Sequence, residues 1–387
     1  MISLSEIINE SILYVEKNDY KSFDIFDALT NPFLDTVTRK TPLFRRIAIQ
    51  VNAKSPLNFR FIGMKRMVHT KTLSDMLSIY SMLFREAGDH KYLARADSMC
   101  SMLGERKISS SNGSGWGLNF PYATRFVDAS VDTPNLYNTI NCLNSLIDYF
   151  EVTSNDQVEL LITDCVNFII KDFGIISGEN GDAWIRYYPG QSHPTYNVNA
   201  LTIAAFCRVN KTLGHELVGR ALISSLLANI IKNQNADGSW FYALSNKGEW
   251  VDGFHTGFIL ESLAVVHSLD GDKYDVAESI KRGTRYYIDN LFSNEQYPEY
   301  YPKKKYPIES QNCAQAIQTL ANIDSSNIND SGLLSKVVEN VTASLYDPNG
   351  YFIHKVGKFY KNKHIYFRWS QTPMIKALLH AKEYLER

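Results

Sequence analysis

Five short polar or aromatic clusters recur along the chain, and each opens an apolar segment that is rich in small residues. Their central residues are Asn138, Asn197, His255, Gln311 and Arg368. Side-chain amides bind hydroxyl groups, an imidazole transfers protons, and a guanidinium binds anions. If the five segments lie side by side, these groups meet in one site for a polar ligand.

His255 is the first candidate for acid–base chemistry, because the unperturbed pKa of an imidazole lies near neutrality. Asp252 and Glu309 are the candidates for its partner, and the phenol of Tyr196 could also exchange a proton with a sugar. Each carries a structural alternative as well. His255 could be a hydrogen-bonded packing residue, while Asp252 and Glu309 could each stabilise the start of a helix.

A second group of residues is suited to substrate binding. Arg368 beside Trp369 could bind a carboxylate or phosphate, and Arg125 offers another anion contact. The alternative for Arg368 is an ion pair with an internal acid that closes the fold. The remaining candidates supply amides or rings: Trp116, Asn119, Tyr122, Asn138, Asn197, Asn199, Gln311, Asn312 and Gln371. We predict no cofactor and no metal site, since no His, Asp or Glu cluster has ligand spacing on one helix.

The spacing of the five clusters indicates which elements position them. Successive central residues are 59, 58, 56 and 57 residues apart, which fits two helices and two loops per repeat. The earlier segment PLNFRFIGMKRM, with Asn58, could supply a sixth copy. Five or six helical hairpins predict an all-α fold, an (α/α)6 toroid in which the N-termini of the inner helices surround one central cavity.

Helical periodicity supports this fold, and strand signals are confined to short aromatic connectors such as residues 350–356. The predicted helices are Thr72–Arg85, Asn135–Phe150, Val158–Asp172, Asn197–Val209, Leu217–Asn233, Gly253–Ser268, Val276–Leu291, Gln311–Ala321 and Pro373–Tyr384. We predict a single toroid domain over residues 1–387, with residues 1–55 as an N-terminal helical extension that packs on it.

Composition argues against several classes of protein. Forty basic and 41 acidic residues give a formal net charge of -1, whereas a protein that coats nucleic acid normally carries a basic excess. Apolar stretches reach about half of the roughly 20 residues that a transmembrane helix needs. The N-terminus lacks a signal-peptide pattern, and the five cysteines form no CxxC pair, so we expect a cytoplasmic protein.

Two resemblances add to these patterns. The segment NQNADGSWFYA resembles the QxxDGSW repeat of squalene–hopene cyclases and related toroids, although no DxDD acid motif is present. Segments spread nearly end to end, among them SFDIFDALTNPFL, SGWGLNFPYATRF and IYFRWSQTPMIKALLHA, resemble a toroid family encoded among bacterial exopolysaccharide and capsule biosynthesis genes. The second resemblance implies a cytoplasmic protein that acts on an activated sugar, a lipid-linked sugar or a glycan.

Together these features predict a capsule, exopolysaccharide or O-antigen biosynthesis protein that binds an anionic sugar, nucleotide-sugar or glycan intermediate. It would modify this substrate by acid–base chemistry, as an epimerase, lyase or hydrolase. Hydrolysis would need two carboxylates about 5 Å or about 6.5–9.5 Å apart. One alternative is a non-catalytic glycan-binding protein that assists a glycosyltransferase or polymerase. Another is a terpenoid-cyclase-like enzyme on an isoprenoid carrier, which predicts a deep and mainly apolar cavity.

Overall fold

The computed structural model of the protein describes residues 2–54, 63–124, 127–245, 247–323 and 332–386. Within these residues, six helices form an inner ring in which each helix packs on the next and the last packs on the first. They are α4 (Thr70–Ala87), α6 (Leu136–Thr153), α8 (Tyr196–Leu213), α10 (Gly253–Asp270), α12 (Ser310–Asn322) and α14 (Thr372–Leu385). Asn58, the predicted start of a sixth copy, lies outside the described residues, and the sixth inner helix begins at Thr70.

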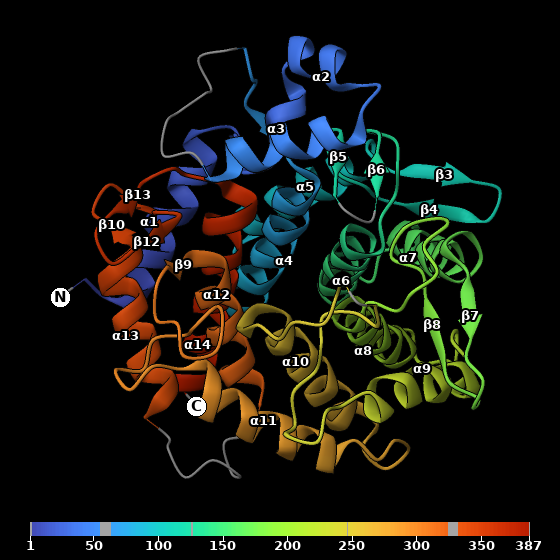
Figure 1. The fold of residues 1–387 in the computed structure, drawn as a ribbon. Coiled ribbons are helices and arrows are strands. Elements are labelled where there is room, and N and C mark those ends of the chain that lie inside the picture. The colour runs from blue at the N-terminus through green and yellow to red at the C-terminus, as the bar shows by residue number, and fades with distance from the viewer. Residues whose placement is uncertain (1, 55–62, 125–126, 246, 324–331, 387) are drawn as a thin grey trace.

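A second layer of helices surrounds the inner ring. Five of these helices each follow an inner helix along the chain and pack on it: α5 (His90–Gly104), α7 (Asp156–Phe168), α9 (Arg220–Lys232), α11 (Ala277–Leu291) and α13 (Leu333–Leu345). The N-terminal helix α1 (Leu4–Lys17) packs on α14, so the two ends of the chain lie side by side (Figure 1). The six pairs confirm the predicted toroid, and all nine helices expected from the sequence are present.

Short antiparallel strands occupy the connectors between the helices. Five pairs are β1 (Lys21–Ser22) with β2 (Met67–Val68), β3 (Ile108–Ser110) with β4 (Gly113–Gly115), β5 (Tyr122–Ala123) with β6 (Asp128–Ala129), β7 (Ile175–Ser177) with β8 (Ala183–Ile185), and β10 (Tyr346–Asp347) with β11 (Tyr351–Phe352). A three-stranded sheet has the order β13 (Lys361–Asn362), β12 (Lys355–Val356), β9 (Ile308–Glu309). These strands are too short to form a layer, so the helices alone make the framework.

A repeated backbone contact fixes each connector over the start of an inner helix. The first N–H of four inner helices donates to a carbonyl of the next connector: Leu136 to Tyr187 at 2.9 Å, Tyr196 to Tyr242 at 3.1 Å, Gly253 to Tyr300 at 2.9 Å, and Ser310 to His354 at 3.0 Å. Such N–H groups have no partner within their own helix. The contact therefore stabilises the helix start and gives Tyr187, Tyr242, Tyr300 and His354 equivalent positions.

Two amides that we predicted as substrate ligands serve the fold instead. Asn199 binds both backbone groups of Ile185, with its Oδ1 accepting from the N–H at 2.8 Å and its Nδ2 donating to the carbonyl at 3.1 Å. Gln371 binds the N–H and the carbonyl of Phe352 in the same way, at 3.0 and 2.6 Å. Because both ends of each amide are occupied, we remove Asn199 and Gln371 from the candidate site.

The segment NQNADGSWFYA forms a turn between α9 and α10. Gln234 donates to the carbonyls of Gly238 and Ser279, at 2.9 and 3.0 Å, so it joins the turn to α11. Gly238 has a φ of +95°, a conformation that L side chains rarely adopt. Trp240 is buried and donates to the carbonyl of Ile230 at 2.9 Å. The segment is therefore a structural turn in this chain.

Helices α2 (Pro32–Thr38) and α3 (Pro42–Lys54), with the short 3-10 helix η1 (Asp27–Thr30), lie at one end of the ring near the β5–β6 connector (Figure 1). Ile49 of α3 is buried and packs in one cluster with Ala123. Arg45 joins α2 to this connector, since it forms ion pairs with Asp35 at 2.7 Å and Asp128 at 2.9 Å. Thus α3 is held over the end of the ring.

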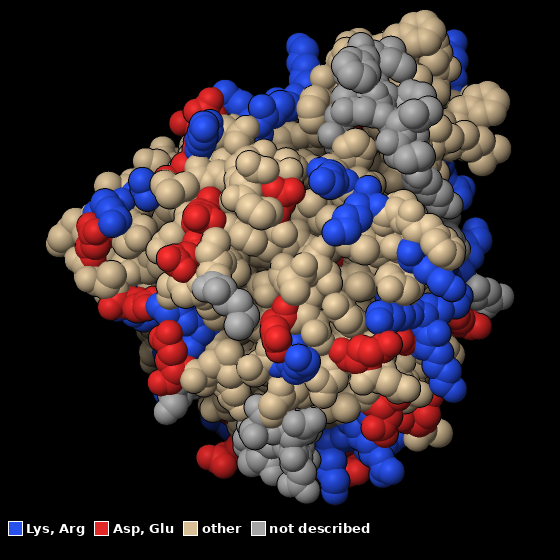
Figure 2. Space-filling model, turned by 90° about the vertical axis from the view of Figure 1, so that its left-hand side faces the viewer, with Lys and Arg blue, Asp and Glu red and all other residues tan. Residues whose placement is uncertain are grey.

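The surface and the helices agree with the expectations from composition. On the face in Figure 2, basic and acidic side chains are interspersed between uncharged ones, and the formal net charge is -1. Within the described ranges, every helix is too short or too polar to cross a membrane.

Candidate active site

The five predicted clusters meet in one cavity. Asn138, Asn197, His255, Gln311 and Arg368 all line a cavity of about 250 Å³ at the end of the ring where the inner helices begin. The first four residues lie in the first turn of α6, α8, α10 and α12. Arg368 lies in η5 (Phe367–Gln371), a π-helical turn that leads into α14. The constant spacing in the sequence therefore corresponds to a shared position in space.

His255 and Asp252 form a hydrogen-bonded pair at the cavity. Asp252 caps α10, because its Oδ1 accepts from the His255 backbone N–H at 2.8 Å. Its Oδ2 lies 2.7 Å from His255 Nδ1 and also accepts from Trp250 Nε1 at 3.0 Å. The carboxylate fixes the proton on Nδ1, so Nε2 carries the lone pair. With its side chain 20% exposed, the imidazole is accessible to a ligand.

Aromatic rings hold this imidazole in place. Tyr242 stacks on Trp250 with ring centroids 4.6 Å apart, and its ring meets His255 at 4.7 Å. The ring of Phe254 lies edge-on to His255 on another side, at 5.2 Å. His255 therefore has little freedom to turn, which suits a group that must meet one atom of a substrate.

Two amide oxygens at the cavity have no hydrogen-bond partner. Asn138 and Asn197 are 2% and 4% exposed, and the Oδ1 atom of each is buried without a donor among the described residues. Buried polar atoms in folded proteins nearly always have a partner, and an orphaned one needs an explanation. Both residues line the cavity, where a ligand hydroxyl could supply the missing donor.

Several tyrosines of the cavity wall were not predicted from the sequence. Tyr187, Tyr242 and Tyr300 line the cavity from equivalent connector positions, and the numbers differ by 242−187 = 55 and 300−242 = 58. This spacing is close to that of the five clusters, so the same repeat could have revealed them. Burial raises the pKa of the Tyr187 and Tyr300 phenols well above the usual value, so both stay protonated and can donate hydrogen bonds.

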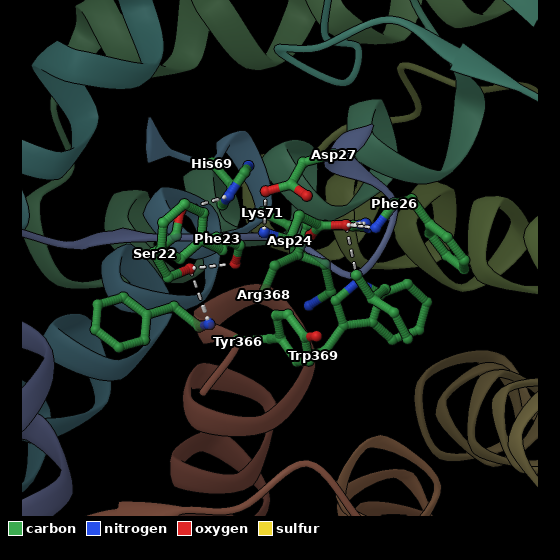
Figure 3. Close-up of polar contacts among 12 residues, drawn as sticks. Ser22, Phe23, Asp24, Phe26, Asp27, His69, Lys71, Tyr366, Arg368 and Trp369 are labelled. Atoms are coloured by element: carbon green, nitrogen blue, oxygen red, sulfur yellow. Dashed lines mark hydrogen bonds and ion pairs between the residues drawn. The ribbon is translucent and has the colours of Figure 1, made fainter. Parts of the chain in front are cut away.

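Arg368 is paired with an acid from the other end of the chain (Figure 3). Its Nε and Nη2 donate to the two carboxylate oxygens of Asp24, at 2.6 and 2.7 Å, and Trp369 Nε1 lies 3.3 Å from the same group. Burial alone would raise the pKa of Asp24. The Arg368 guanidinium lowers it by more than burial raises it, so the pKa of this carboxyl lies below its ordinary value. We predicted a free anion contact at Arg368, and the alternative, an internal ion pair that closes the fold, is what the structure contains.

The other predicted acid–base groups lie apart from the cavity wall. Glu309 is in β9 opposite Lys355, and burial raises its pKa to about 7, although Lys355 opposes this shift. Tyr196 is 2% exposed at the start of α8. Neither residue is among those that line the cavity.

Of the remaining predicted binding residues, some line the cavity and others make contacts within the fold. Tyr122 and Trp369 line the cavity, whereas Trp116 is buried and donates to the carbonyl of Leu103 at 2.9 Å. Asn119 donates to the carbonyl of Val68 at 2.8 Å. Asn312 is buried behind the wall, and Arg125 lies outside the described residues.

The carboxylates near this cavity lie behind its wall, where Asp252 binds His255 and Asp24 binds Arg368. Among the described residues that line it, none is Asp or Glu. Over the described ranges as a whole, no group of three or more His, Cys, Asp or Glu side chains could hold a metal ion. His255 is the one imidazole among the described residues that line the cavity.

Solved structures show where this architecture occurs. No protein-family model matches the sequence, and no curated protein is similar to it. A cellobiose 2-epimerase from Bacillus thermoamylovorans is 14% identical with a TM-score of 0.66, and the match covers 82% of this chain and 88% of that one. A sugar epimerase from a ruminal bacterium is 16% identical with a TM-score of 0.65, over 84% and 90% of the two chains.

A third match is an α-mannanase of glycoside hydrolase family 76 from Bacteroides thetaiotaomicron. It is 12% identical with a TM-score of 0.63, over 82% of this chain and 87% of that one. At these identities the likeness establishes the fold. The chain is an (α/α)6 toroid of the kind found in these sugar epimerases and this mannanase.

Proposed function

We propose that the protein is a sugar-modifying enzyme that binds its substrate in the cavity and transfers a proton at a carbon next to a carbonyl group. One observation carries this proposal: an imidazole oriented by a carboxylate faces a cavity with two orphaned amide oxygens. Two of the similar structures are a cellobiose 2-epimerase and a sugar epimerase, which agrees with proton transfer on a sugar.

Each side chain has a defined task in this reaction. Asp252 holds the proton on Nδ1, so that Nε2 of His255 removes a proton from the sugar carbon. The electron pair of the broken C–H bond moves to the carbonyl oxygen, for which we propose the phenols of Tyr187 and Tyr300, two residues of the cavity wall, as hydrogen-bond donors. Return of the proton by His255 to the neighbouring carbon, with the hydroxyl proton moving to the former carbonyl oxygen, gives an isomer, whereas an epimer needs a second proton donor on the other face of the sugar. Loss of a leaving group from the next carbon would instead give elimination.

Hydrolysis has less support than proton transfer. Most glycoside hydrolases use two carboxylates that flank the bond they cleave. Since none of the described lining residues is Asp or Glu, His255 would have to replace both. A terpenoid-type reaction has less support as well, because it predicts a mainly apolar cavity without the orphaned amides.

We also propose a role in polysaccharide biosynthesis, with a cytoplasmic location and with glycosyltransferases of the same pathway as partners. This part depends on the sequence resemblance described above. The ion pair of Arg368 with Asp24 removes the free cation that favoured an anionic sugar ring, so we propose an uncharged ring for the cavity itself.

Proton exchange with solvent tests the proposed reaction directly. Neutral sugars that raise the melting temperature are incubated with the protein in D2O, and the loss of C–H signals is followed by proton NMR. We expect exchange at one carbon, and a rate about 10²–10⁴-fold lower for His255→Gln. Tyr196→Phe is the matched control, because the Tyr196 ring does not line the cavity.

Two results would count against the proposal. Exchange that continues at the normal rate in His255→Gln would assign the base elsewhere. Sugar binding without exchange in the normal protein would favour the non-catalytic glycan-binding alternative.

A further inference from the structure

A groove continues from the cavity along helix α3. It has a volume of about 730 Å³ and shares His255 and Tyr242 with the cavity wall. One side is the rim of the cavity, including Trp250, and the other side is α3. A substrate whose sugar reaches His255 therefore has a second part that can lie in this groove.

The α3 side of the groove is an aliphatic stripe. Leu43, Ile47 and Val51 are spaced four residues apart, so they lie on one face of the helix. They are 55%, 48% and 52% exposed, whereas Ile49 on the opposite face is 1% exposed and packs against the ring end. At about 1.5 Å per residue, the stripe is roughly 12 Å long. Three exposed aliphatic residues in line are costly to leave in water.

The same groove contains an arginine that is not paired with a carboxylate of the described residues. Arg46 lines it and makes no hydrogen bond or ion pair with another described residue. Its neighbour Arg45 is different, because Asp35 and Asp128 both bind that guanidinium. The groove thus combines an aliphatic wall with the guanidinium of Arg46, for which the described part of the chain supplies no carboxylate.

We propose that this groove binds the hydrocarbon chain of an amphiphilic substrate, in which a phosphate joins the chain to a sugar hydroxyl other than the anomeric one, so that the reacting carbonyl stays free. The sugar occupies the cavity, the phosphate lies against Arg46, and the chain lies along Leu43, Ile47 and Val51. The proposed substrate is therefore an anion even though its sugar ring is uncharged. Its negative charge lies on the phosphate, outside the cavity, where it contacts Arg46 and not Arg368. The inference deepens the proposed function and rests on it for the position of the sugar.

A longer glycan is a poorer occupant of this groove. Sugar hydroxyls placed against an aliphatic stripe would lose hydrogen bonds to water without replacement. Apart from Tyr242, Trp250 and His255 at the rim of the cavity, Gln50 and Thr124 are the uncharged polar side chains among the described lining residues, and they offer few partners for a chain of sugars. A hydrocarbon chain gains free energy from the same surface.

Alkyl phosphates without any sugar test the groove independently of the cavity. Dissociation constants are measured by calorimetry for inorganic phosphate and for butyl, hexyl and octyl phosphate, below the concentrations at which these form micelles. Each methylene that becomes buried should tighten binding by up to about fourfold. Octylammonium, with the opposite charge, should bind more weakly than octyl phosphate.

Matched variants of α3 locate the binding. The double variant Leu43→Asp, Ile47→Asp should abolish the dependence on chain length. Phe44→Asp is the control, since Phe44 is 54% exposed on the same helix but does not line the groove. Arg46→Ala should weaken every phosphate by a similar factor, about tenfold, and leave the dependence on chain length intact. Circular dichroism confirms that each variant is folded.

Two outcomes would overturn the proposal. The first is an affinity that does not change with chain length, or a dependence that survives the double variant. The second is tighter binding of cello-oligosaccharides with each added sugar, lost in the double variant, which would make the groove a glycan subsite. Because the alkyl phosphates contain no carbonyl and both measurements record binding without turnover, either outcome leaves the proton-exchange test of His255 unaffected.

Discussion

The two ends of the ring contain cavities of similar size but opposite character. The near cavity, at the N-terminal ends of the inner helices, has a volume of about 250 Å³. The far cavity, lined from the middle and C-terminal parts of inner helices, has a volume of about 310 Å³. Volume therefore does not identify the site.

Several polar groups of the far cavity are bound to one another or to neighbouring side chains. Arg208 pairs with Asp148 at 2.6 Å and donates to Asn144 at 2.9 Å. Glu261 accepts from Gln315 and Gln318, at 2.6 and 2.9 Å. Among the described residues that line it, no buried side-chain atom lacks a partner.

The near cavity keeps polar groups unpartnered instead. The Oδ1 atoms of Asn138 and Asn197 have no donor among the described residues, and the side chain of His255 lines the same cavity. Polar groups that the fold satisfies contribute to stability, whereas groups left open are available to a ligand. The comparison therefore indicates that the near cavity binds a ligand and that the polar groups of the far cavity stabilise the fold.

The largest effect should come from the buried ion pair of Arg368 at the near end. Asp24 and Arg368 have side chains 0% and 8% exposed, so Asp24→Ala leaves a buried, uncompensated guanidinium. We expect the free energy of unfolding, measured by urea denaturation, to fall by about 3–5 kcal/mol. Adding Arg368→Met should recover part of the loss. A loss under about 1 kcal/mol would contradict a structural role for this pair.

A substitution at the far cavity should lower the stability of the protein and leave its sugar affinity unchanged. Arg208→Met removes the partner of Asp148, and because the Arg208 side chain is 22% exposed we expect the low end of the range, about 3 kcal/mol. Sugar affinity of the folded variant, measured by calorimetry, should be unchanged. A selective loss of sugar affinity would reverse the assignment of the two ends.

Removing the orphaned amides of the near cavity should weaken sugar binding with little effect on stability. Asn138→Ala and Asn197→Ala each remove an unpartnered oxygen, so the free energy of unfolding should change by less than about 1 kcal/mol. The dissociation constant for a bound sugar should rise about 10- to 100-fold. Asn144→Ala is the matched control at the far end, because the Oδ1 of Asn144 accepts from Arg208. If the variants at both ends changed sugar affinity and stability equally, the proposed difference between the two cavities would be wrong.

The last prediction concerns pH. Burial raises the pKa of Glu309 to about 7 from an ordinary value of 4.5. The folded protein then holds a proton that the unfolded chain releases, so the free energy of unfolding should fall as pH rises between these values. Glu309→Gln should flatten this slope in urea denaturation at several pH values. An unchanged slope would show that another group is responsible.

The sequence predicted the framework well because a repeat constrains geometry. A constant spacing requires equivalent positions, so Asn138, Asn197, His255, Gln311 and Arg368 could be placed around one cavity from their spacing alone. The same argument, applied to aromatic residues, would have added the tyrosines of the connectors.

What the sequence could not provide was the state of each polar group. Asn197 and Asn199 are two residues apart on α8, yet one amide oxygen is orphaned and the other amide binds Ile185. The partner of Arg368 is Asp24, which is 344 positions away in the chain. Such distinctions depend on distant contacts, which spacing does not encode.

A thermal-shift comparison of the two ends tests the central claim most directly. The melting temperature is measured with and without glucose, mannose and cellobiose for the normal protein, for Asn138→Ala with Asn197→Ala, and for Asn144→Ala. A ligand at 100 times its dissociation constant stabilises a protein by about 2.7 kcal/mol, which is visible as a shift. We expect a shift in the normal protein and in Asn144→Ala, and its loss in the near-cavity double variant. A shift that persists in the double variant and disappears in Asn144→Ala would place the ligand at the far end and contradict the claim.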